Sequence, residues 1–107
     1  MRRIRFTMFK QVWRLIFVPR SKLYIRRSGE QLDGVCDVPD HPGQVLTEAN
    51  REIHVRNDLD SEDMLETVLH ELTHAAFPDK REDYVEHFAR DASRLLVRLG
   101  YGRHDAQ

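Results

Sequence analysis

The 107-residue sequence contains one cysteine, Cys36, and no long run of uncharged apolar residues. A single thiol cannot form a disulfide within the chain, and it is too few for a zinc site made of cysteines. The longest uncharged apolar run near the N-terminus, residues 15–18, is far too short for a signal-peptide core or a membrane span. We therefore expect a cytoplasmic protein without membrane contact, and the length fits a single domain over residues 1–107.

The first 29 residues contain no acidic side chain. They carry nine of the 17 basic residues, whereas all 18 acidic residues follow position 29. Such an asymmetry can indicate a surface that binds nucleic acid or an acidic partner. It also arises where the outer faces of two packed elements complement each other in charge, and we favour this second interpretation. Nucleic acid remains an alternative partner.

Two stretches of the sequence have the pattern of β-strands. Residues 12–18 are rich in aromatic and β-branched side chains, and residues 51–56 alternate polar with apolar side chains. Residues 23–25 are a candidate short strand, whereas the turn-forming residues of 34–43 predict an irregular loop. The charged side chains of residues 51–56 favour a position at the edge of a sheet.

Apolar residues recur every three or four positions in two C-terminal segments. The first predicted helix follows several N-cap candidates at residues 57–61 and ends near Ala76, because Pro78 stops it. Asp79 is predicted to cap the second helix, and Gly100 is predicted to end it. Together these segments predict an α+β fold, in which a small, mostly antiparallel sheet of about three strands packs on two helices.

The first predicted helix contains an HExxH motif, His70-Glu71-Leu72-Thr73-His74. Helical residues four apart lie on one face, about 6 Å apart, so His70 and His74 can bind one Zn²⁺ at ~2.0–2.1 Å. Glu71 lies about 100° around the helix, beside the metal, where a base that acts on a water molecule is required. The alternative interpretation is a pair of solvated histidines on a polar face, because both lie opposite the apolar stripe.

A catalytic zinc ion takes three protein ligands and leaves one position for water. A third histidine ten residues after His70 is excluded because Lys80 stands there. Two helices with a short link form an antiparallel hairpin. In that hairpin Glu82 would border the packed face of the second helix, within reach of the first helix. Glu82 is therefore our predicted third ligand.

Glu86 is the alternative third ligand. If Glu82 binds the metal, Glu86 is predicted to accept a hydrogen bond from the outer ring nitrogen of His70. Glu82 also has a competing role, because Asp79 and Glu82 have the spacing of a capping box. The sequence alone leaves these three arrangements open.

The HExxH motif followed by Glu82-x-x-Val85-x-x-Phe88-Ala89 resembles the gluzincin metallopeptidases, which carry a glutamate on the helix after HExxH. The short spacing is most similar to the minigluzincins and to small phage-borne, ImmA/IrrE-like zinc peptidases. The resemblance covers residues 65–99, and it implies a zincin-like fold with one catalytic Zn²⁺. It implies His70, His74 and Glu82 as metal ligands, Glu71 as general base and acid, and residues 53–56 as the edge strand that holds an extended peptide.

We therefore expect a zinc-dependent metallopeptidase that hydrolyses peptide or protein substrates by means of a metal-activated water. A group that stabilises the oxyanion is also expected, with Tyr84, Tyr101 and His87 as candidates. One alternative function is a non-catalytic zinc-binding module with a regulatory or interaction role. Another is a DNA-associated protease that uses the basic segment of residues 1–29.

Overall fold

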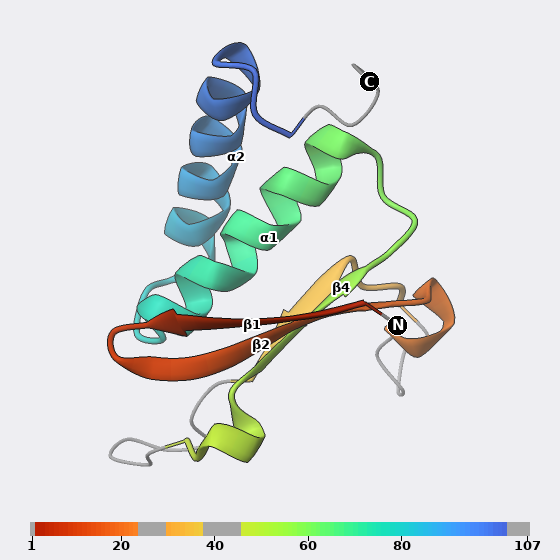
Figure 1. The fold of residues 1–107 in the computed structure, drawn as a ribbon. Coiled ribbons are helices and arrows are strands. Elements are labelled where there is room, and N and C mark those ends of the chain that lie inside the picture. The colour runs from red at the N-terminus through yellow and green to blue at the C-terminus, as the bar shows by residue number, and fades with distance from the viewer. Residues whose placement is uncertain (1, 24–29, 38–45, 103–107) are drawn as a thin grey trace.

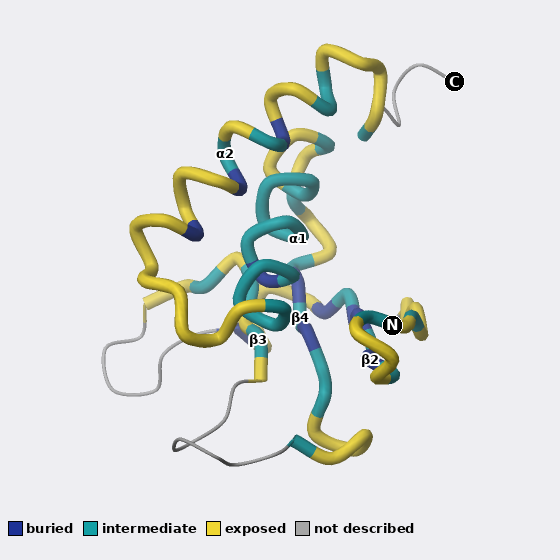
Figure 2. The backbone as a smooth tube through the Cα atoms, turned by 90° about the vertical axis from the view of Figure 1, so that its left-hand side faces the viewer, coloured by how far each residue is buried: buried dark blue, intermediate teal, exposed yellow. Residues whose placement is uncertain are grey.

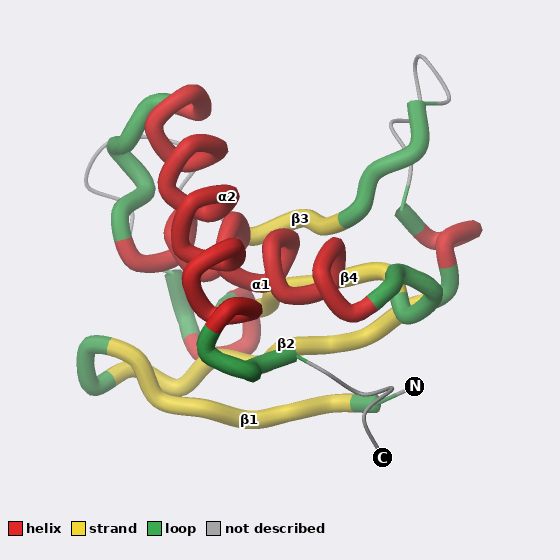
Figure 3. Tube along the Cα trace, turned by 90° about the horizontal axis from the view of Figure 1, so that it is seen from above, coloured by secondary structure: helices red, strands yellow, loops and turns green. Residues whose placement is uncertain are grey.

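One sheet and two helices make up the computed structural model, which describes residues 2–23, 30–37 and 46–102. The sheet has four strands in the order β1-β2-β4-β3, and both helices lie on one of its faces (Figures 1 and 3). The elements are β1 (Arg3–Met8), β2 (Gln11–Val18), β3 (Gly34–Cys36), β4 (Glu52–Arg56), α1 (Ser61–Ala76) and α2 (Glu82–Arg98). The predicted α+β class is confirmed, with four strands where about three were expected.

The first two strands form a hairpin that the sequence pattern did not reveal. β1 pairs antiparallel with β2, and the turn between them is made by Phe9 and Lys10. Both turn residues have positive φ, 51° and 63°. Two-residue hairpins need this conformation because it matches the twist of the strands, but glycine and asparagine normally supply it. The turn therefore carried no recognisable signal.

β4 lies inside the sheet and not at its edge. It pairs parallel with β2 and antiparallel with β3, so two of the three strand pairs are antiparallel. Ile53 and Val55 of β4 are fully buried, because both point to the face that α1 covers. The edge strand next to β4 is β3, which lies within the stretch predicted as an irregular loop. The predicted strand at residues 23–25 falls largely outside the described residues.

α1 packs on the sheet, and α2 packs on α1 (Figure 1). Asp60, one of the N-cap candidates at residues 57–61, caps α1 by accepting a hydrogen bond from the Asp63 amide at 2.8 Å. The N-cap of α2 is Arg81, so the predicted cap at Asp79 is wrong. Gly100 ends α2 with a φ of +97°, as predicted. The main core cluster consists of Trp13, Leu15, Ile53 and Val55, with Val68 and Leu72 of α1 packed against it.

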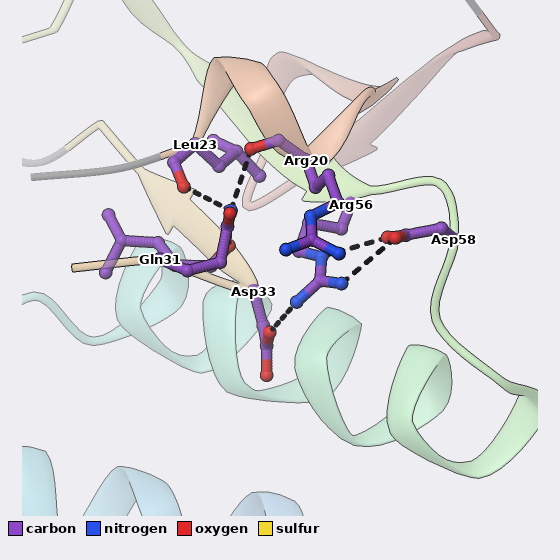
Figure 4. Close-up of polar contacts among 7 residues, drawn as sticks. Arg20, Leu23, Gln31, Asp33, Arg56 and Asp58 are labelled. Atoms are coloured by element: carbon purple, nitrogen blue, oxygen red, sulfur yellow. Dashed lines mark hydrogen bonds and ion pairs between the residues drawn. The ribbon is translucent and has the colours of Figure 1, made fainter. Parts of the chain in front are cut away.

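A polar cluster attaches the chain before β3 to β4 (Figure 4). The Arg56 guanidinium donates to Asp33 at 2.9 Å and to both carboxylate oxygens of Asp58 at 2.9 and 3.0 Å. The Gln31 amide donates to the carbonyl group of Leu23. Because this cluster comes directly before β3, it fixes the edge strand that borders the cleft described below.

The basic N-terminal strands form ion pairs with acidic residues later in the chain. Arg5 contacts Glu48 at 3.3 Å, and Arg14 contacts Glu52 at 3.1 Å. These pairs agree with the favoured interpretation of the charge asymmetry. No helix among the described residues is long and apolar enough to cross a membrane.

Candidate metal centre

His70 and His74 turn their rings toward each other, one helical turn apart on α1. Their Nε2 atoms are 3.2 Å apart, and the side chains are 24% and 19% exposed. Both line a cleft of about 870 Å³ between β3, α1 and the start of α2. The alternative of two fully solvated histidines does not describe this arrangement.

Glu82 joins this pair from the first turn of α2. Its Oε1 lies 2.7 Å from Nε2 of His70, and its Oε2 lies 2.7 Å from Nε2 of His74. The hairpin after Pro78 places the start of α2 opposite the end of α1, as the sequence predicted. The competing capping box is not formed, because Arg81 occupies the N-cap position without a side-chain cap.

Glu86 lies one turn further along α2 and also lines the cleft. Its Oε1 accepts a hydrogen bond from Nη2 of Arg90 at 2.9 Å. The structure therefore pairs Glu86 with Arg90, where the sequence predicted a hydrogen bond from His70. Of the two candidate third ligands, Glu82 is the one whose carboxylate contacts both histidines.

These donor atoms fit a zinc ion. Four ligands at ~2.0–2.1 Å in a tetrahedron lie about 3.3 Å from one another, and the two imidazole nitrogens are 3.2 Å apart. The Glu82 oxygens are closer to the nitrogens, at the length of a hydrogen bond. Glu82 is 64% exposed, so its carboxylate has room to withdraw to ligand spacing. Two imidazoles and one carboxylate are a ligand set that catalytic zinc accepts.

Glu71 is buried beside the two histidines, with only 6% of its surface exposed. One donor atom from each of His70, Glu71 and His74 lies within 4.8 Å of the others. The pKa of Glu71 is raised to about 7, mainly by burial; the charge of His70 lowers the pKa and that of the nearby Glu82 carboxylate raises it. A carboxyl group with a pKa near neutrality can both accept and return a proton.

This raised pKa predicts how the stability of the metal-free protein depends on pH. The folded protein holds the Glu71 proton up to about pH 7, whereas a glutamate in the unfolded chain has a pKa of 4.5. Folded protein binds more protons in this range, so the free energy of unfolding falls as pH rises, by up to about 1.4 kcal/mol per pH unit. Denaturation with a chelator present, between these two pH values, measures the slope. Glu71→Gln should flatten it, and an unchanged slope in that variant contradicts the prediction.

Gly34 on β3 is a positioning residue that the sequence analysis did not single out. A Cβ atom at this position would lie 2.9 Å from Cγ2 of Thr67, 3.1 Å from Cγ of Glu71 and 3.2 Å from the His54 carbonyl oxygen. The missing side chain therefore lets the edge strand approach α1 at Glu71. A glycine within a strand often marks such a close approach, but this glycine stood in a stretch predicted as a loop.

We expect Gly34→Ala to destabilise the protein by about 1–3 kcal/mol, because the new methyl group overpacks the contact between β3 and α1. The β-branched Thr67 side chain is restricted in its rotamers, and the His54 carbonyl belongs to the backbone. Moving either of them away from the new methyl group therefore costs free energy. Val35→Ala is the matched control, since Val35 is the next residue on the strand and is 41% exposed. Urea denaturation of both variants measures the difference, and equal stabilities would show that β3 does not approach α1 this closely.

Cys36 also lines the cleft from β3. Burial raises the pKa of its thiol to about 12, and the charges of Glu71 and Asp37 act in the same direction. The group is therefore a neutral thiol at physiological pH. None of the predicted oxyanion candidates Tyr84, Tyr101 and His87 is among the described residues that line the cleft, whereas Lys80 is.

Comparison of the chain with protein-family models, with curated proteins and with solved structures finds no match. The resemblance to gluzincins thus rests on the HExxH motif and Glu82. The distances between these side chains are what support a function for the protein.

Proposed function

We propose that the protein is a zinc-dependent metallopeptidase. The proposal rests on one observation: the carboxylate oxygens of Glu82 lie 2.7 Å from the Nε2 atoms of both histidines of the HExxH motif. Glu71 lies next to this group and is buried, as a base that works beside a metal should be. Two ligands come from one helix and one from the next, so the hairpin of α1 and α2 preorganises the set.

Bound zinc supplies a Lewis acid that lowers the pKa of water and polarises a carbonyl group. Glu71 takes up the proton that the attacking water loses, and it gives that proton to the amine as the C–N bond breaks. Lys80 is the lysine that lines the cleft, and we assign it to the negative charge that develops on the carbonyl oxygen.

The outer edge of β3, with which no strand among the described residues pairs, is the place for an extended peptide. β3 borders the cleft and lies at the end of the strand order, so its outer backbone groups can pair with an added strand. This assigns to β3 the role that the resemblance had given to residues 53–56.

The proposal is tested by measuring the metal content of the purified protein and its hydrolysis of unfolded casein and a peptide library. We expect about one zinc per chain, cleavage of the substrate, and loss of activity with a chelator. His70→Ala is the control, because it removes one ligand and should abolish both zinc binding and cleavage. Stoichiometric zinc without any cleavage would indicate the alternative, a non-catalytic zinc-binding module.

A further inference from the structure

A second cavity lies beside His74, at the C-terminal end of α1, and measures about 300 Å³. It is bounded by this end of α1, by the β1–β2 turn, and by residues that follow β3 and precede β4. Its apolar walls are formed by Phe9, Trp13, Leu46, Ala75, Ala76 and Pro78. We call it the end cavity.

The end cavity reaches from the core to the surface of the molecule. Trp13 in its wall is 4% exposed, whereas Phe9 is 69% exposed. The Phe9 ring also packs edge to face on Phe77, with the ring centroids 6.1 Å apart. The last turn of α1 is half-buried, and the link that follows it is exposed (Figure 2). A ligand can therefore enter the cavity from solvent.

The polar groups in the wall favour an uncharged occupant. Nε of Arg51 donates to the Val12 carbonyl oxygen at 2.8 Å, and its Nη1 donates to that of Leu46 at 2.7 Å. The guanidinium thus connects β2 to the segment before β4. Burial raises the pKa of Asp37, because its surroundings disfavour the charged form. An apolar side chain fits such walls better than a charged one does.

β3 leads from the cleft of the candidate metal centre to the end cavity. Cys36, the last residue of β3, lines the cleft, and the next residue, Asp37, lines the end cavity. α1 shows the same order, since His70 lines the cleft, Ala75 lines the end cavity, and His74 lines both. A peptide paired with the outer edge of β3 therefore passes the metal centre and then the end cavity.

The dimensions of the end cavity suit a single side chain. An apolar cavity of about 150 Å³ is enough to bind benzene, so the end cavity has room for one aromatic or long aliphatic group. Successive residues of a strand are about 3.3 Å apart, which brings the cavity beside His74 within reach of a residue close to the cleaved bond. We propose that the end cavity is the specificity pocket of the peptidase, and that it takes a large apolar side chain one or two residues from the cleaved bond.

This inference rests on the proposed function, and a digest of a random peptide library by the zinc-loaded full chain tests it. We expect large apolar residues to be enriched at one fixed position within two residues of the cleaved bond. Two peptides that carry Phe or Ala at that position then give the Phe/Ala preference, the ratio of their kcat/KM values. Burial of an aromatic side chain should make this ratio about 10 or more.

Two variants change the end cavity in opposite ways. Phe9→Ala removes part of its wall and should lower the Phe/Ala preference by about three-fold or more. Ala76→Phe fills the cavity and should reverse the preference, so that the Ala peptide becomes the better substrate. Phe88→Ala is the matched control, since Phe88 is 56% exposed on α2 and is not among the described residues that line the cleft or the end cavity. Circular dichroism and zinc content check that each variant is folded and loaded.

The results separate this inference from the proposed function. Cleavage without a preference near the cleaved bond, or with a preference for basic residues, overturns the inference and leaves the peptidase in place. An unchanged preference in Ala76→Phe, or an equal loss of preference in Phe88→Ala and Phe9→Ala, overturns it as well. A zinc-loaded chain that cleaves no member of the library contradicts the proposed function itself, and the inference with it.

Discussion

Replacing Glu71 with glutamine is expected to abolish peptide hydrolysis and leave zinc binding intact. Glutamine fills the space of the buried side chain, which is 6% exposed, but it cannot accept or return a proton. Loss of a general base lowers the rate by about 10²–10⁴-fold. The two histidines and Glu82, which hold the metal in our proposal, are untouched.

Two measurements on the same preparation check this expectation. The first is kcat/KM on a cleaved peptide, and the second is zinc content after dialysis. Glu66→Gln is the matched control, since Glu66 lines the same cleft from α1 and has no role in the proposed chemistry. Near-wild-type activity of Glu71→Gln would remove Glu71 from the mechanism. Loss of zinc together with activity would instead assign it a part in metal binding.

The stability of Glu71→Gln should separate the effect of the substitution on catalysis from its effect on folding. Because burial raises the pKa of Glu71, ionising the carboxyl group at neutral pH costs folding free energy. A neutral glutamine avoids that cost, so the variant should be at least as stable as wild type above pH 7. An inactive but stable protein would show that the buried charge serves chemistry and not folding.

The helices and the histidine pair were predictable because they depend on local spacing. Residues four apart share a helix face, whatever the rest of the chain does. Thus the position of His70 relative to His74 followed from the sequence. The placement of Glu82 needed one further step, the reversal of the chain at Pro78, and a short link makes that geometry nearly local as well.

The sheet was less predictable because its pairings are not local. The parallel pairing of β2 with β4 joins residues far apart in the chain, and it moved β4 from the expected edge to the interior. The turn at Phe9 and Lys10 uses positive φ without glycine, so it gave no signal. The approach of Gly34 to Glu71 requires both the sheet order and the packing of α1, and no spacing rule contains that information.

Glu82→Ala is expected to weaken zinc binding by more than about 100-fold, because loss of a mere supporting partner already costs 10–100-fold. Glu86→Ala should cost less than about 10-fold, since Glu86 is paired with Arg90 and not with the histidines. The two glutamates lie one turn apart on α2 and are similarly exposed, at 64% and 54%. They are therefore matched in helix and exposure, and they differ in their partners, which are the imidazoles for Glu82 and Arg90 for Glu86.

Competition against a zinc-binding dye measures both affinities. Thermal unfolding with and without zinc supplies a second readout, because a ligand that binds only the folded state raises Tm, and raises it more the more tightly it binds. The increase in Tm on addition of zinc should disappear in Glu82→Ala and persist in Glu86→Ala. A reversed order of the two affinities would assign the third ligand to Glu86. Equal, small losses in both variants would mean that only the two histidines hold the metal, and the gluzincin-type centre would then be wrong.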